Sequence, residues 1–121
     1  MEQNKLPDVL KGLKVLDMTR VITGPYCGMM LADMGAEVVK LEVPGVGDDA
    51  RAYPPFQNGE SMMFQLFNRN KNSITLNLKT DRGKEIFKEL LPHFDILLEN
   101  FRPGVMDKMG LGYTDLEKIH P

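Results

Sequence analysis

Short apolar runs alternate with amphipathic stretches along this chain, and their order predicts strands alternating with helices. The first run, Lys14–Met18, has the length of a buried strand. Gly24 and Pro25 then break the pattern, and proline is well placed in the first turn of a helix. Gly35 is a natural stop for that helix, and a second apolar run follows it. Residues 13–42 therefore predict a strand–helix–strand unit with parallel strands and a right-handed crossover.

The helix of this unit is expected to bury one apolar stripe. Its members recur at spacings of three and four residues, as on one helix face: Cys27, Met30, Leu31 and Met34. Cys27 is therefore interpreted as a packed core thiol rather than a nucleophile. A single cysteine excludes an internal disulfide and favours a reducing, cytoplasmic location.

The rest of the chain continues the α/β pattern. Ser73–Leu78 alternates apolar and polar residues, as a half-buried strand does. Thr80 is expected to cap the next helix. Asp95–Leu98 predicts a fourth, buried strand. Short helical turns are predicted at 103–109 and from 114 onward.

The connection between the second and third strands is predicted to be irregular. Prolines and glycines punctuate Val43–Pro55, and Gln57–Gln65 is expected to continue the loop. Met62–Phe67 is too apolar for a free linker. Loops of this length in compact domains are usually functional or covered by another part of the protein.

Composition narrows the class of protein. The 121 residues predict one domain, and the net charge of −2 with mixed signs argues against nucleic-acid binding. No run approaches membrane-spanning length, so a soluble protein without a membrane partner is expected. The fold class predicted is α/β, a Rossmann-like, mainly parallel sheet with flanking helices. The loop Thr19–Gly24 should lie at the carboxyl edge of this sheet, where open α/β sheets bind ligands.

Several motifs together resemble the class III coenzyme A transferase family, of the CaiB/BaiF and formyl-CoA transferase type. The motifs are Leu13–Gly24, Leu31–Glu42, Pro44–Asp49, Asn68–Ile74 and Glu99–Gly104. The similarity runs from about residue 10 to residue 121. Family members are much longer, so the resemblance implies that residues 1–121 are the N-terminal, CoA-binding part of the family's large Rossmann-like domain.

The resemblance implies an enzyme that moves CoA between an acyl-CoA and a carboxylic acid, with no metal and no permanently bound cofactor. In the family, an aspartate carboxylate attacks the thioester and becomes a covalent intermediate. No aspartate of this chain matches that motif, so the catalytic aspartate is expected beyond Pro121 and the chain alone should be inactive. Family members form interlocked homodimers, and Met62–Phe67 is a candidate for a surface that a partner covers.

The resemblance also assigns CoA-binding positions. The loop after the first strand approaches the thiol end of CoA and the active site, and its members are Arg20, Val21, Ile22 and Thr23. The helix that follows offers backbone donors to anionic groups at its N-terminus. Asn100 and Phe101 match positions that line the CoA channel.

The nucleotide end of CoA is assigned to residues after the third strand and near the C-terminus. Lys79 matches a contact to the nucleotide, and Leu76 would pack against the adenosine. Lys108 and Met109 match a pair that borders the adenine and the 3′-phosphate, where lysine acts as a mobile point charge.

One departure from the family pattern concerns the residue after Glu42. Relatives often carry a basic residue there, whereas this chain has Val43. Arg51 and Lys108 are the candidates to supply that charge. His93 and His120 lie outside the matched motifs and are interpreted as surface residues.

Three alternatives remain open from sequence. An α-methylacyl-CoA racemase of the same superfamily would share the CoA site, although the long connection Asp49–Asn68 favours a transferase. In an NAD-binding Rossmann domain, Glu42 would be the ribose-binding acid, but the chain lacks Gly-x-Gly-x-x-Gly and has only Gly24 and Gly28 there. The third alternative is that this chain is a non-enzymatic, structural part of a protein and needs a partner chain.

Overall fold

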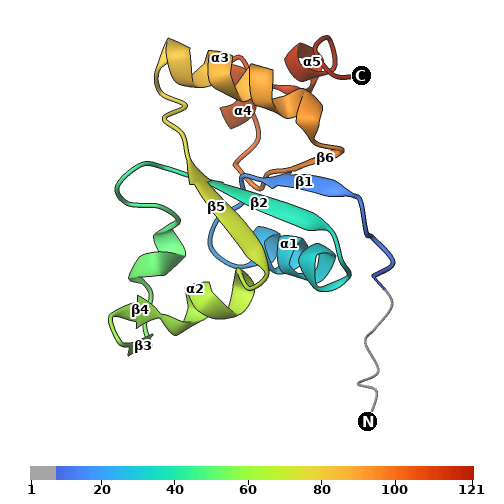
Figure 1. Cartoon of the computed structure of the whole chain (residues 1–121). Coiled ribbons are helices and arrows are strands. Elements are labelled where there is room, and N and C mark those ends of the chain that lie inside the picture. Colours follow the sequence, from blue (N-terminus) through green and yellow to red (C-terminus); the bar gives the residue numbers. More distant parts are fainter. Residues whose placement is uncertain (1–7) are drawn as a thin grey trace.

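A computed structural model describes residues 8–121 and shows a parallel sheet between helices (Figure 1). Its four strands lie in the order β5-β2-β1-β6, and all pairs are parallel. The strands are β1 Lys14–Asp17, β2 Glu37–Glu42, β5 Lys71–Thr75 and β6 Ile96–Leu98. Val15 of the central β1 pairs with Val38 on one side and with Ile96 on the other. The predicted α/β class with a mainly parallel sheet is confirmed.

The alternation of side chains along β1 divides the core between the two faces of the sheet. Leu16 is fully buried with Phe87 from α3 (Asp81–Leu90) on one face. Val15 is fully buried with Ala32 from α1 (Thr23–Asp33) on the other. Figure 1 shows α1 and α3 on opposite sides of the strands. Each face of the sheet therefore has its own helix and its own hydrophobic cluster.

The prediction of which residues of α1 are buried was wrong. Its residues Cys27, Met30 and Met34 are exposed and Leu31 is only half-buried. The buried face consists instead of Pro25, Gly28, Met29 and Ala32. A Cβ at Gly28 would lie 2.6 Å from Asp17 Oδ2, so the helix approaches β1 at its smallest residue. Hydrophobic periodicity missed this face because small residues carry little hydrophobicity, and Cys27 is consequently a surface thiol.

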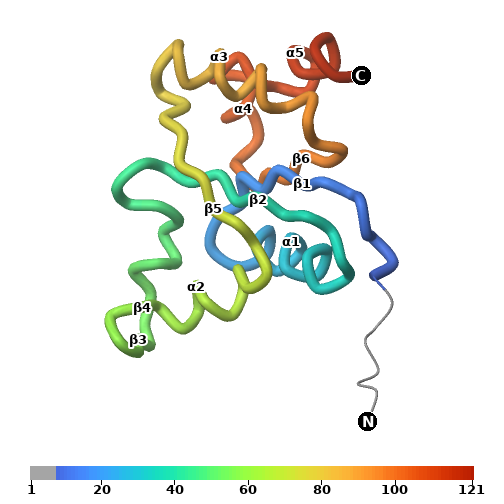
Figure 2. The backbone as a smooth tube through the Cα atoms, viewed as in Figure 1, coloured from blue at the N-terminus to red at the C-terminus, as the bar shows by residue number. Residues whose placement is uncertain are grey.

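The connection between β2 and β5 is more ordered than the sequence predicted. It contains a 3₁₀ helix, η1 (Asp49–Ala52), the antiparallel pair β3 (Phe56–Gln57) and β4 (Glu60–Ser61), and α2 (Met62–Phe67). The prediction of an irregular 57–65 was therefore wrong. Ser61 begins α2 by accepting a hydrogen bond from the Phe64 amide at 3.3 Å, and Phe64 is buried. In Figure 2 the segment with β3, β4 and α2 lies below and to the left of the neighbouring strands β2 and β5.

The C-terminal third follows the prediction with shifted boundaries. β5 begins two residues before the predicted Ser73 because Lys71 is already paired with Val38. Thr80 caps α3 as expected, accepting a hydrogen bond from the Gly83 amide at 3.0 Å. The remaining elements are η2 (Leu91–His93), α4 (Val105–Lys108) and α5 (Tyr113–Leu116).

The first turn of α3 packs so closely on the preceding loop that it requires glycine. A Cβ at Gly83 would lie 1.9 Å from the carbonyl oxygen of Asn77. We expect Gly83→Ala to destabilise the fold by about 1–3 kcal/mol, because the loop must move to admit a methyl group. Urea unfolding followed by circular dichroism measures this, with the exposed Glu89→Ala in the same helix as control. An unchanged midpoint for Gly83→Ala would contradict the packing described.

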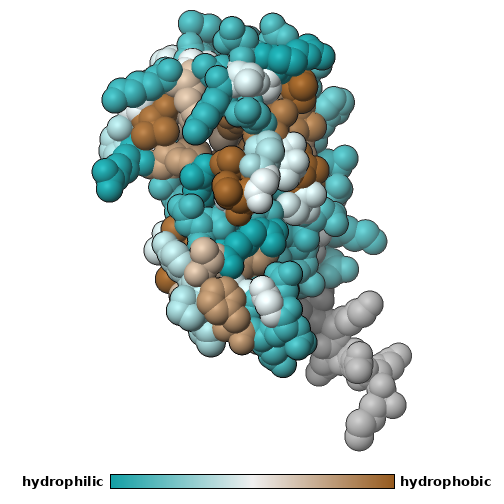
Figure 3. Space-filling model, turned by 90° about the vertical axis from the view of Figure 1, so that its left-hand side faces the viewer, coloured by the Kyte–Doolittle hydropathy of each residue, from teal (hydrophilic) through white to brown (hydrophobic). Residues whose placement is uncertain are grey.

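The surface around β3, β4 and α2 exposes several apolar side chains. Phe56 is 53% exposed and Leu66 is 54% exposed. On the face that Figure 3 shows, apolar residues lie in small groups separated by hydrophilic ones. That a partner subunit covers Met62–Phe67 stays a prediction. No helix among residues 8–121 combines the length and the apolar character needed to cross a membrane.

Candidate functional site

The candidate site lies at the edge of the parallel sheet where all four strands have their carboxyl ends. The carboxyl ends of parallel strands meet at the same edge. The loops that leave this edge are 18–22 after β1, 43–48 after β2, 76–80 after β5 and 99–104 after β6. These loops contain all the predicted CoA-binding residues except Thr23, which begins α1, and the pair 108–109.

An apolar cavity of about 260 Å³ opens between these loops. Its wall combines aliphatic side chains from the sheet edge with the ring of Phe101 and the ammonium-bearing Lys79. The lining residues are Met18, Arg20, Leu41, Val43, Leu76, Asn77, Leu78, Lys79, Phe101, Val105 and Met109. Lys79 forms no ion pair with another residue in the described range 8–121, so its charge is available to a ligand.

A second, more open cavity of about 450 Å³ borders the first. It is lined by Arg20, Val21, Ile22, Thr23, Asp49, Asn100, Phe101 and Arg102. Arg20 and Phe101 belong to both cavities, and the Arg20 guanidinium carbon lies 5.4 Å from the centre of the Phe101 ring. This cation–π pair therefore stands between the two cavities.

The loop after β1 has an unusual backbone. Val21 has a φ of +71°, a left-handed conformation that is strained for a β-branched residue. The Asn100 side chain holds the backbone of the neighbouring Arg20: its Oδ1 accepts from the Arg20 amide and its Nδ2 donates to the Arg20 carbonyl, both at 2.9 Å. The side-chain amide of Asn100 thus supports the loop.

Two buried ion pairs lie beneath this loop. Lys40 Nζ lies 2.8 Å from Asp48 Oδ2 and also donates to the Thr19 carbonyl at 2.9 Å. Lys71 Nζ lies 2.8 Å from Asp17 Oδ2. All four side chains are at most 2% exposed. Burial lowers the pKa of Lys71, and the Asp17 carboxylate opposes this shift.

Glu42, at the end of β2, is buried, and both of its carboxylate oxygens accept hydrogen bonds. Arg51 donates to both of its carboxylate oxygens at 2.8 Å, and Ser73 Oγ donates at 2.6 Å. Burial alone would raise the pKa of Glu42, but hydrogen bonds from Arg51, Ser73 and the Asp48 amide outweigh it and lower this pKa to about 2. The carboxylate has no free oxygen to hold a ribose, which argues against the NAD alternative.

Two predicted sources of nucleotide-binding charge line neither cavity. Arg51 is committed to Glu42 and stacks on the ring of Phe64, 3.8 Å from its centre, so it does not replace a basic residue at 43. Lys108 is exposed on α4 and lines neither cavity, whereas its neighbour Met109 lines the first.

The remaining predicted residues do come together at the two cavities, and sequence reasoning missed several others. The missed residues are Met18, Leu41, Val43, Asn77, Leu78 and Val105 in the first cavity, with Asp49 and Arg102 in the second. Asn77 and Leu78 lie between the predicted Leu76 and Lys79, so their place at a strand end was a usable signal. Arg102 follows Phe101 in the loop after β6, so its place near a strand end was also a usable signal.

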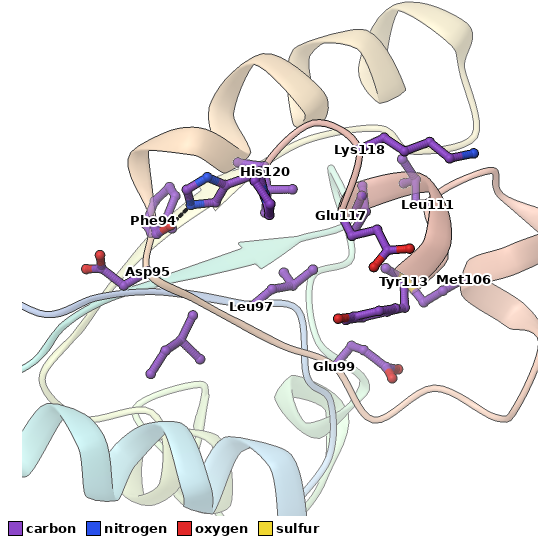
Figure 4. Close-up of a pocket in the computed structure, with 14 residues that line it drawn as sticks. Phe94, Asp95, Leu97, Glu99, Met106, Leu111, Tyr113, Glu117, Lys118 and His120 are labelled. Atoms are coloured by element: carbon purple, nitrogen blue, oxygen red, sulfur yellow. Dashed lines mark hydrogen bonds between the residues drawn. The ribbon is translucent and has the colours of Figure 1, made fainter.

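A larger cavity, of about 780 Å³, lies elsewhere, toward the C-terminal end (Figure 4). Leu97 and Glu99 border one side of it, and Tyr113 and Glu117 come from the region of α5 on the other (Figure 4). The His120 ring sits against the Phe94 carbonyl, with Nε2 at 3.0 Å. This cavity contains none of the predicted residues, and its carboxylates disfavour a ligand with several phosphates.

The chemistry of the sheet edge suits an elongated anionic ligand. An apolar cavity next to a free ammonium accommodates a base and its phosphates, and the second cavity adds the guanidinium groups of Arg20 and Arg102. No group of three or more His, Cys, Asp or Glu side chains within residues 8–121 is arranged to hold a metal ion.

Comparison with known proteins gives one consistent result. The family described as CoA-transferase family III matches residues 10–121. A succinyl-CoA:glutarate CoA-transferase of Mus musculus is 52% identical over 93% of this chain and 26% of its own length. An acetyl-CoA:oxalate CoA-transferase of Acetobacter aceti is 48% identical over 91% of this chain and 28% of its own length.

Solved structures agree with the sequence matches. A CaiB/BaiF family protein from Brucella suis superimposes with a TM-score of 0.87 at 39% identity, covering 96% of this chain and 32% of its own. The protein Rv3272 of Mycobacterium tuberculosis gives a TM-score of 0.85 at 41% identity, covering 98% of this chain and 31% of its own. The chain thus spans between a quarter and a third of the length of these relatives.

Proposed function

The chain belongs to CoA-transferase family III, and from that premise we propose that it is the CoA-binding part of an enzyme that moves CoA between an acyl-CoA and a carboxylic acid. The observation that carries the proposal is the pair of adjoining cavities at the carboxyl edge of the sheet, which share Arg20 and Phe101. An elongated ligand that passes these two residues would occupy both cavities.

We place the adenosine of CoA in the apolar cavity, against Leu76 and Met109. Lys79 at the rim then binds a phosphate of the nucleotide. The pantetheine arm passes Arg20 and Phe101, and the thiol end reaches the second cavity beside Val21 and its neighbours. CoA is a substrate in this proposal, and the chain needs no permanently bound cofactor.

The reaction proposed for the parent protein uses a carboxylate nucleophile. An aspartate attacks the acyl-CoA thioester carbonyl and expels the CoA thiolate, which gives an acyl-aspartyl anhydride. The thiolate then attacks the aspartyl carbonyl and releases the first acid, which leaves an aspartyl–CoA thioester. The acceptor carboxylate attacks the aspartyl carbonyl of this thioester, which expels the CoA thiolate and forms a new anhydride. The thiolate then attacks the acceptor's carbonyl of this anhydride, which forms the new acyl-CoA and releases the aspartate. None of these steps uses a residue of this chain as nucleophile, so the 121 residues alone should bind CoA without turnover.

The relatives' names support dicarboxylic acids as the substrate class. The mouse relative is named for succinyl-CoA and glutarate, and the Acetobacter aceti relative for acetyl-CoA and oxalate. A racemase of the same superfamily remains the alternative, and assay of the parent protein for loss of α-deuterium separates the two. An interlocked homodimer and a cytoplasmic location stay predictions.

Binding of CoA to this chain tests the proposal directly. We expect isothermal titration to show binding of CoA and none of NAD, because Glu42 is not free to hold a nicotinamide ribose. Lys79→Ala should weaken CoA binding about tenfold, since it removes a charge-assisted hydrogen bond to phosphate.

Lys11→Ala is the matched control, because it removes the same charge from an exposed residue outside both cavities. An equal loss of CoA affinity in the two variants would mean that binding depends only on the net charge of the protein. Preferential binding of NAD would overturn the proposal.

A further inference from the structure

Three consecutive residues of the loop after β1 have backbone groups held by side chains from other parts of the sheet edge. Lys40 Nζ donates to the Thr19 carbonyl at 2.9 Å, and Asn100 holds both polar groups of Arg20. The Val21 amide donates to Asp48 Oδ1 at 3.0 Å. Side chains distant in sequence therefore help to fix the shape of this loop.

Asp48 links two of these attachments. Its Oδ1 accepts from the Val21 amide, and its Oδ2 lies 2.8 Å from Lys40 Nζ, which holds Thr19. The carboxylate is itself held in place: the Asp48 amide donates to Glu42 Oε1 at 2.9 Å, and Oδ1 also caps η1 through the Ala50 amide. Asp48 is 2% exposed, so water does not compete for these bonds.

The residue that Asp48 holds is the strained one. A valine at φ +71° is costly, and such a conformation persists only where the surroundings over-determine it. Arg20 and Ile22, on either side of Val21, both line the second cavity. Relaxation of Val21 to an ordinary backbone conformation would turn these two neighbours relative to each other and change the shape of that cavity.

We propose that Asp48 is a positioning residue of the CoA site: its buried carboxylate holds Val21 in the left-handed conformation that shapes the second cavity. The inference rests on the proposed function for its ligand, CoA, but the geometry of the loop can be tested without any ligand. Asp48 does not touch either cavity, so its effect on binding must pass through the loop.

The test compares Asp48→Ala with Asp48→Asn and with Val38→Ala. Val38 is buried beside Ala32 and takes part in none of the side-chain hydrogen bonds that hold the loop, so its truncation destabilises the fold without removing any of them. Asparagine keeps an oxygen that can accept from the Val21 amide. We expect Asp48→Ala to weaken CoA binding at least about tenfold, Asp48→Asn to restore most of the affinity, and Val38→Ala to bind as the unmodified chain does once the unfolded fraction is subtracted.

Hydrogen exchange of the Val21 amide, measured by NMR, provides the ligand-free readout. We expect slow exchange in the unmodified chain and faster exchange in Asp48→Ala than in Val38→Ala. If the unmodified chain fails to bind CoA, the proposed function fails, while the Val21 amide still decides the role of Asp48. Fast exchange of that amide in the unmodified chain overturns the inference. So does CoA binding by folded Asp48→Ala that equals binding by Val38→Ala.

Discussion

Asp17→Ala is expected to reduce the free energy of unfolding by about 3–5 kcal/mol, because it leaves the buried ammonium of Lys71 without a counter-charge. Lys71 Nζ would keep only the Pro25 carbonyl and the Asn68 side chain as partners, at 2.9 and 3.0 Å. Asp17 also accepts from the Thr19 amide at 2.9 Å, so its loss frees the start of the site loop. Denaturant unfolding followed by circular dichroism measures the effect.

A solvent-exposed ion pair provides the control. Arg82 and Glu85 on α3 are 3.1 Å apart but 70% and 62% exposed, so Glu85→Ala should change stability by less than about 0.5 kcal/mol. The double variant Asp17→Leu with Lys71→Met should be more stable than Asp17→Leu alone, because it removes the unpaired charge as well. A loss below about 1 kcal/mol for Asp17→Ala would show that water or movement relieves the buried lysine.

Acid should weaken the fold through Glu42. Its pKa is about 2 in the folded protein, below the ordinary value of 4.5. A lowered folded-state pKa contributes stability that is present above pH 4.5 and is lost as the pH falls toward 2. The shift corresponds to about 2 kcal/mol, after allowance for the partly exposed Arg51, whose attraction water screens.

Comparison with Glu42→Gln isolates this contribution from that of the other acids. The variant should be less stable than the unmodified chain at pH 6, and the difference should shrink as the pH falls from 4.5 to about 2.5. Glu85→Gln, on an exposed carboxylate, serves as the control and should show no such convergence. A difference that stays constant over this range would mean that Glu42 does not titrate as its partners imply.

The strand and helix order could be predicted from sequence because it depends on local patterns. The apolar run of β1, the glycine stop at Gly35 (φ +101°) and the Thr80 cap each act within a few residues. The buried face of α1 could not be predicted from its periodicity, because it is set by contact of Gly28 with the Asp17–Lys71 pair. That contact joins residues far apart in sequence.

The candidate site divides in the same way. Residues at strand ends, such as Lys79 and Phe101, could be assigned from their motifs, and the structure places them at a cavity. The role of Asp48 could not be assigned, because an aspartate in a Gly-Asp turn is typical of any loop. Its significance depends on a hydrogen bond to Val21, 27 residues away in sequence. Arg51 was a candidate for nucleotide-binding charge, because the sequence does not reveal that its guanidinium forms an ion pair with Glu42.

The position of β6 at the edge of the sheet links the site to the order of folding. β1 pairs with β2 across a short helical connection, whereas its pairing with β6 joins Val15 to Ile96 across most of the chain. Closing the longer loop costs about 1 kcal/mol more in chain entropy. Both cavities have one wall from the β1 loop and another from the residues after β6. Both cavities are therefore complete only when β1 has paired with β6, the pairing that closes the longest loop of the sheet. Loss of this pairing would open the site, while the β1–α1–β2 unit would keep its own contacts.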